Sequence, residues 1–221
     1  MAFVYAKYDE KTAQDMLLAS ALAYCPADKI MLGNCMQATI KTEQAGIIPI
    51  HSKDNGSTSD PITYAIMVRK SKKQIIVAFS GTAGFTELID EIEQVLPVSY
   101  SLHDSPGAQV FNFFFDHYNN DFRVDFMKNI MIAVKEYSGY SVIFTGHSLG
   151  GALTVHACAD AILSGAILKN KVYLYTYGQP RVGNQQFNDL FHSKLNGAFR
   201  LTHNRDLVPH VPPCIPDGLH N

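Results

Sequence analysis

The stretch SVIFTGHSLGGALTVHACADAI, residues 141–162, joins an apolar run to a Gly-x-Ser-x-Gly motif and an alanine-rich segment. Val142 to Phe144 predict a strand, and residues 149–164 predict a helix that begins directly after Ser148. A serine at such a junction is held in a strained conformation, and glycines two residues before and after it relieve the crowding. Isolated, the motif is weak because glycines also mark ordinary turns. Its context favours Ser148 as a nucleophile at the edge of a sheet.

The rest of the chain alternates predicted strands and helices, with no linker long enough to divide it. We therefore expect one domain over residues 1–221. The predicted helices cover residues 9–24, 107–118, 121–137 and 185–195, and the other predicted strands cover 63–68, 74–80, 172–177 and 198–202. This alternation, with strands that are apolar on both faces, predicts an α/β fold with a mostly parallel central sheet flanked by helices. The basic run 70–73 is interpreted as a solvated turn between two strands.

Composition excludes several classes of protein. The 221 residues are 47% hydrophobic and 17% charged, with a net charge of -2 and no basic stripe, so we expect a globular core and no nucleic-acid partner. No segment reaches the roughly 18 apolar residues of a membrane span, and the N-terminus has no apolar stretch of signal-peptide length. If the protein is exported, the signal has been removed or lies outside this chain.

The four cysteines show no spacing suited to zinc, so we expect neither a metal nor a cofactor. Cys25 and Cys35 flank a short loop and could close a disulfide in an oxidising compartment. Cys158 falls inside the helix that follows the serine, where it is interpreted as a small core residue.

A serine nucleophile needs an acid and a histidine, which follow it in that order in this type of fold. Asp160 and Asp189 fall within predicted helices and are interpreted as solvated surface charges. Asp206 instead follows a predicted strand, in a loop of the kind that builds sites at the carboxyl ends of parallel strands. Asp206 is therefore the candidate acid.

The candidate base is His220. His147 is expected to point elsewhere on the turn, and His210 lies only four residues beyond Asp206 in the stretch VPHVPP, which makes a pairing over Ser148 awkward. Three further histidines are expected to be structural: His156, His192 and His203.

Four motifs in this order make the chain resemble the class 3 lipases, the fungal-lipase-like branch of the α/β-hydrolases, and most closely their secreted nematode-type members. The motifs are FSGT (79–82), GHSLGGALT (146–154), YGQPRVGN (177–184) and RLTHNRDLVPHVPP (200–213). The resemblance implies Ser148 as nucleophile and Asp206 as triad acid. It also implies an oxyanion hole formed by the backbone N–H groups of Thr82 and Leu149, and secretion of the protein.

Two departures from the family pattern matter. The family commonly has Arg where this chain has Ser80, so an ion pair expected there is missing. The family's catalytic histidine lies in a Gly-aromatic-x-His stretch with several residues after it, whereas here GLHN ends at Asn221. Either His220 is the base, or the chain is shortened at its C-terminus and ends just short of the base.

The segment GFTELIDEIEQVLPVSY, residues 84–100, bears on the substrate. At about 100° per residue its apolar side chains fall on one side and its acidic ones on the other. Periodicity alone predicts a surface helix packed on the core. The resemblance implies a lid that covers the serine, with an acyl-binding wall formed by Phe85, Leu88, Ile89 and Ile92.

The resulting expectation is a carboxylic ester hydrolase, a triacylglycerol lipase that works through a serine acyl-enzyme at a lipid–water interface. An aryl or feruloyl esterase shares the triad and remains an alternative. A catalytically dead lipid-binding protein is the alternative from another class, because it needs only a missing or misplaced histidine.

Overall fold

The computed structural model describes residues 7–59, 61–82, 84, 95–168 and 171–214. Six strands form the main sheet, in the order β1–β2–β3–β6–β7–β8. The pairs from β3 to β8 are parallel, and β1 and β2 extend the sheet as antiparallel strands. The predicted, mostly parallel sheet is thus confirmed. The strands are Ile48–Asp54 (β1), Thr63–Arg69 (β2), Gln74–Phe79 (β3), Ser141–His147 (β6), Val172–Tyr177 (β7) and Gly197–Leu201 (β8).

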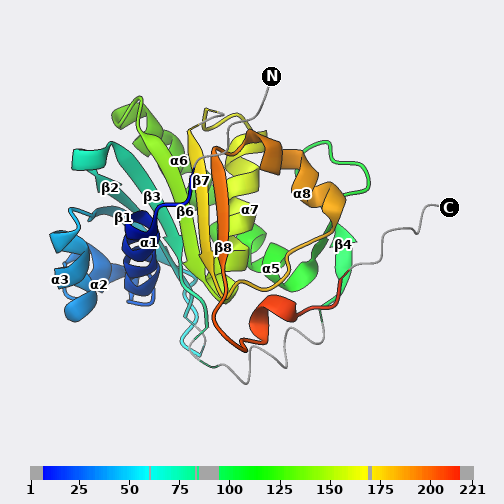
Figure 1. The fold of residues 1–221 in the computed structure, drawn as a ribbon, viewed down its shortest axis with the longest axis horizontal. Coiled ribbons are helices and arrows are strands. Elements are labelled where there is room, and N and C mark those ends of the chain that lie inside the picture. Colours follow the sequence, from blue (N-terminus) through cyan, green and yellow to red (C-terminus); the bar gives the residue numbers. More distant parts are fainter. Residues whose placement is uncertain (1–6, 60, 83, 85–94, 169–170, 215–221) are drawn as a thin grey trace.

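Helices cover both faces of this sheet, with α1 on one side and α7 on the other (Figure 1). Alternation along each strand builds the two cores, since successive side chains point to opposite faces. On β6, Val142 and Phe144 join the α7 side while Ile143 joins the α1 side. The helices are Glu10–Leu22 (α1), Ala27–Met31 (α2), Gln37–Gln44 (α3), Asn112–Asp116 (α5), Arg123–Glu136 (α6), Leu149–Leu163 (α7) and Gln185–Phe191 (α8).

The predicted helix over residues 107–118 is partly wrong. Residues Gln109–Phe111 form β5, which pairs with β4, Pro97–Ser99, in a small antiparallel sheet. Only α5 is helical there, and a single π turn, His117–Phe122, connects it to α6. Strand β1 and helices α2 and α3 were not expected at all. The basic run does form a turn, the 3-10 helix Lys70–Lys72 between β2 and β3.

Cys25 and Cys35 are joined by a disulfide, with their Cα atoms 6.2 Å apart. The bridge closes the loop that contains α2, immediately after α1. Cys158 is fully buried in α7, as expected for a core residue. Among the described residues, no helix has the length and apolarity required to cross a bilayer.

Candidate active site

Ser148 lies at the sharp turn between β6 and α7, where the motif predicts it. Its backbone has φ 55° and ψ -129°, in the left-handed region that a residue with a side chain rarely adopts. The Ser148 N–H donates to the carbonyl of Tyr177 at 2.9 Å, and the Ser148 carbonyl accepts from Gly151 N–H at 2.9 Å. The turn is therefore fixed on both sides by backbone hydrogen bonds.

The glycines around the serine are required by close backbone contacts. A Cβ on Gly146 would lie 2.3 Å from the carbonyl oxygen of Gly150, and a Cβ on Gly150 would lie 2.2 Å from that of Phe79. The first turn of α7 thus packs directly against the ends of β6 and β3. No side chain fits between these backbones.

The FSGT loop after β3 lies against the same turn. A Cβ on Gly81 would be 3.2 Å from Ser148 Cβ and 2.9 Å from the carbonyl oxygen of His147. Thr82 follows Gly81 directly, on the loop beside the serine. Leu149 is the first residue of α7, so its N–H has no acceptor within the helix. The two residues expected to supply the oxyanion hole are thus both on segments that adjoin Ser148.

Ser80, at the position where the resemblance implies an arginine, is buried and bonded to β2. Its Oγ accepts the N–H of Thr63 at 2.8 Å, and its own N–H donates to the Thr63 carbonyl at 2.8 Å. These two hydrogen bonds to Thr63 hold the start of the FSGT loop in place without an ion pair.

Asp206 reaches the carboxyl end of β7 from the loop after β8. One carboxylate oxygen accepts the Val208 N–H at 3.0 Å. The other lies against Gly178, where an added Cβ would be 2.9 Å from Asp206 Oδ2 and 3.7 Å from His147 Nε2. Gly178 itself has φ 54°. The candidate acid therefore meets the serine turn across the end of β7, with the imidazole of His147 close by.

Two arginines hold the loop that carries this acid. Arg200 donates to the carbonyls of Gln179 at 2.6 Å and Pro209 at 2.9 Å, and Arg181 donates to those of Pro212, at 2.8 Å, and His210. Burial lowers the pKa of Arg200, and the nearby charge of Arg181 lowers it further. Both arginines belong to the family-like motifs, but the sequence did not reveal what they bind.

His147, the residue before the serine, contacts Tyr24 instead of the serine. Its Nδ1 lies 2.8 Å from Tyr24 Oη. Partial burial lowers the pKa of His147, and the Asp206 carboxylate opposes this shift. The expectation that His147 points away from the catalytic position on the turn agrees with this contact. Tyr24 was not expected near the site.

Several expected site residues lie outside the described residues. They are the candidate base His220 and the four lid residues Phe85, Leu88, Ile89 and Ile92. His210, the other histidine considered as base, is exposed.

Asp160 corrects one interpretation. It was expected to be a solvated surface charge, but it is fully buried and accepts hydrogen bonds from three side chains. The donors are His103 Nε2 at 2.7 Å, Tyr118 Oη at 2.7 Å and Arg123 Nε at 2.8 Å. At about 1.5 Å per residue, Asp160 lies roughly 18 Å along α7 from Ser148. Its role is therefore in packing rather than in the candidate triad.

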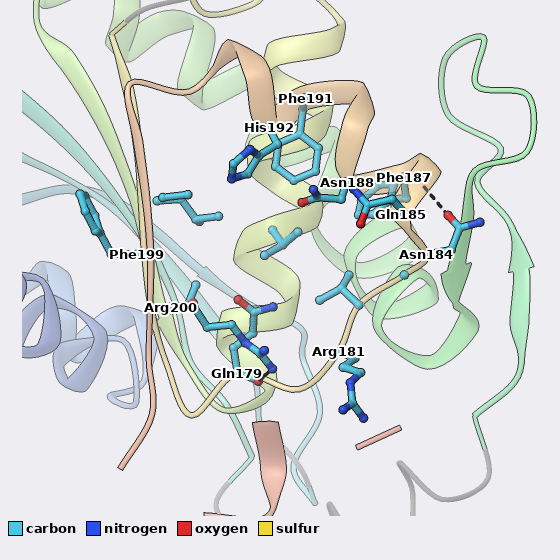
Figure 2. A pocket seen from close by; sticks show the side chains of 16 residues that line it. Gln179, Arg181, Asn184, Gln185, Phe187, Asn188, Phe191, His192, Phe199 and Arg200 are labelled. Atoms are coloured by element: carbon cyan, nitrogen blue, oxygen red, sulfur yellow. Dashed lines mark hydrogen bonds between the residues drawn. The ribbon is translucent and has the colours of Figure 1, made fainter. Parts of the chain in front are cut away.

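A cavity of about 370 Å³ lies between α7, α8, β7 and β8, and Figure 2 shows the side chains that line it. Apolar side chains such as Val155 and Leu174 form part of its wall, and Arg200 lines it as well. Ser148 and Asp206 are not among the residues that line it, so this cavity is separate from the serine turn. Within the described ranges, no group of three His, Cys, Asp or Glu side chains is arranged to hold a metal.

We compared the sequence with protein families and with known proteins. The family model "Lipase (class 3)" matches residues 76–215. A Caenorhabditis elegans lipase is 29% identical over 213 residues, which are 96% of this chain and 58% of that protein. The Rhizomucor miehei lipase is 33% identical over 160 residues, 72% of this chain and 43% of that protein. The chain thus spans about half the length of the curated relatives it matches.

Solved structures agree with the family match. The lipase from Rhizopus microsporus var. chinensis superposes with a TM-score of 0.79 at 30% identity, covering 95% of this chain and 71% of that one. A triacylglycerol lipase described as having a serine protease triad superposes with a TM-score of 0.80 at 27% identity, covering 95% and 77%. The fold of the described chain is that of the α/β-hydrolases.

Proposed function

Because the chain belongs to the class 3 lipase family, we propose that it is a serine carboxylic ester hydrolase acting on acylglycerols. One observation carries the proposal: Ser148 has the strained backbone of a nucleophile at a strand–helix turn, with the FSGT loop on one side and the Asp206 carboxylate nearby. These groups follow the carboxyl ends of β3, β6 and β8. Parallel sheets build their sites at this edge.

In the proposed reaction Ser148 Oγ attacks the ester carbonyl carbon and its proton passes to the base, for which His220 is the candidate. The N–H groups of Thr82 and Leu149 stabilise the oxyanion, and Asp206 fixes the imidazole tautomer and stabilises its positive charge. The base then protonates the departing alcohol, leaving an acyl-serine. Water, deprotonated by the same base, releases the acid and regenerates the serine.

We propose in addition that the protein is secreted and works at a lipid–water interface. The Cys25–Cys35 disulfide supports the first part, since such bridges persist in oxidising compartments. The amphipathic pattern of residues 84–96 supports the second, because its apolar face suits contact with lipid.

Ser148→Ala tests the central proposal. The variant should lose ester hydrolysis and labelling by a fluorophosphonate probe, while its thermal unfolding stays nearly unchanged, because alanine keeps the Cβ that the turn already accommodates. Ser164→Ala, at the far end of α7, is the matched control and should retain both activities. Unchanged turnover in Ser148→Ala would refute the hydrolase.

The lid distinguishes a lipase from an aryl or feruloyl esterase. Hydrolysis of a short-chain ester should rise sharply once the ester exceeds its solubility, and Ile89→Lys or Ile92→Lys should remove that rise while sparing the dissolved ester. Ile132→Lys, at an exposed position on α6, controls for added charge. A smooth saturation curve through the solubility limit favours the esterase.

The base is tested by comparing His220→Ala with His210→Ala. If His220 is the base, its loss should lower kcat/KM by several orders of magnitude, because the triad works as a unit. His210→Ala should have a far smaller effect. The reverse ranking would assign the base to His210, and a wild-type chain without hydrolysis or probe labelling would favour the catalytically dead lipid-binding protein.

A further inference from the structure

Tyr24 contacts two segments of the candidate active site at once. It follows α1, and its hydroxyl lies 2.8 Å from Nδ1 of His147, the residue before the serine. The backbone of Gly81, the residue before Thr82, lies against the same hydroxyl. The fit is close, because a Cβ on Gly81 would lie 2.6 Å from Tyr24 Oη.

The protons of this contact can be assigned. Burial raises the pKa of Tyr24 to about 12, so the phenol keeps its proton at neutral pH. Burial also lowers the pKa of His147, which favours the neutral imidazole. The protonated hydroxyl can therefore donate to Nδ1 of the neutral imidazole. His147 then carries its proton on Nε2, the nitrogen on the Asp206 side.

We propose that Tyr24 is a positioning residue for the oxyanion hole. Through Gly81 on one side and His147 on the other, its hydroxyl sets the distance between the Thr82 N–H and Ser148 Oγ. This inference rests on the proposed function, because it assigns a partner to the same site.

A small displacement here matters for catalysis more than for binding. An oxyanion donor acts only when it lies about 2.7–3.1 Å from the oxygen as negative charge develops, and loss of one donor lowers kcat by about 100- to 1,000-fold. A loosened donor loses part of that effect. Substrate binding in the ground state should be little affected, so the change should appear in kcat and not in KM.

The surroundings of Tyr24 are suited to holding it still. The next residue, Cys25, is bonded to Cys35, which fixes the backbone on one side. Helix α1 fixes the other side, since Met16, Ala19 and Leu22 are buried against the sheet. The Tyr24 residue as a whole is 40% exposed, so its hydroxyl is held by its contacts and not by burial of the whole side chain.

Tyr24→Phe removes the hydroxyl and keeps the ring. On a dissolved short-chain ester, with enzyme counted by fluorophosphonate titration, kcat should fall about 10- to 100-fold while KM stays within about twofold. Tyr173→Phe is the matched control, because it removes a half-buried hydroxyl that accepts from Asn196 at 3.0 Å at the opposite end of β7. It should leave kcat unchanged. Titration of active sites separates a lower rate from a smaller folded fraction.

A second measurement does not depend on turnover. Amide hydrogen exchange at Gly81 and Thr82, followed by NMR, should be at least about tenfold faster in Tyr24→Phe than in wild type, and unchanged in Tyr173→Phe. An active wild type with equal kcat in Tyr24→Phe overturns the inference and leaves the proposed function intact. Unchanged exchange at both amides overturns it as well. An inactive wild type refutes the proposed function, and exchange then decides alone whether Tyr24 positions the loop.

Discussion

His156 and Asp160 lie one turn apart on α7, both fully buried, and only Asp160 has hydrogen-bond partners. Neither ring nitrogen of His156 has a partner among the described residues. The His156 ring instead lies among aromatic rings, those of Tyr100, Phe115, Tyr118 and Phe187. One face of α7 therefore carries a buried carboxylate with hydrogen-bond partners and a buried imidazole without them, and both lie away from the serine turn.

We expect Asp160→Asn to destabilise the protein by about 2–4 kcal/mol, because the amide nitrogen would face donors and the Arg123 charge would lose its partner. Urea unfolding measures this change. Asp189→Asn, on the exposed face of α8, is the matched control and should change stability by less than about 0.5 kcal/mol. Equal effects of the two substitutions would contradict a structural role for Asp160.

The buried imidazole of His156 predicts that the free energy of unfolding decreases at acidic pH. Burial lowers the pKa of His156 to about 3, against the nearby Asp160 charge that raises it. The unfolded chain therefore binds a proton at higher pH than the folded one, and stability falls as pH drops from about 6.5 toward 3, by up to about 1.4 kcal/mol per pH unit. His156→Phe should flatten this slope in urea unfolding measured at several pH values. His147 contributes in the same direction, so the difference between wild type and His156→Phe is the diagnostic quantity.

Two glycine substitutions should distinguish the cost of a steric clash from the cost of an unfavourable backbone conformation. Gly150→Ala places a Cβ 2.2 Å from the Phe79 carbonyl oxygen, where only backbone could move, so we expect a loss of at least about 3 kcal/mol or failure to fold. Gly56 has φ 74° and nothing within 4 Å of an added Cβ, so Gly56→Ala should cost only about 1–2 kcal/mol from its backbone conformation. Thermal unfolding of the two variants gives the comparison.

Local signals explain what could be predicted. The serine turn is specified by a strand, two glycines and a helix within about twenty consecutive residues, so the position of Ser148 followed from sequence. The place of Asp206 in the fold followed because its loop comes directly after a recognisable strand. The class of fold followed from the alternation of strands and helices.

Features that depend on distant partners were missed. Residues 109–111 were predicted as helix because they directly precede a helical segment, but they form a strand that pairs with residues 97–99. Strand β1 is polar and only half-buried, so its pairing with β2 and not its own pattern defines it. Asp160 read as a surface charge because its three donors lie 37 to 57 residues earlier in the chain. Tyr24 could not be assigned to the site, because 123 residues separate it from His147.

Because of the Cys25–Cys35 disulfide, the conformation of the segment that follows Tyr24 depends on the redox conditions under which the protein is produced. The cysteines are 10 residues apart, and closing a loop of that size restricts the unfolded chain by an amount equivalent to about 2.7 kcal/mol. A preparation from a reducing cytoplasm would contain the same sheet and serine turn but an untethered segment directly after Tyr24. If the proposed activity holds, batches that differ only in thiol content would differ in specific activity, so a free-thiol assay belongs beside every rate measured on this protein.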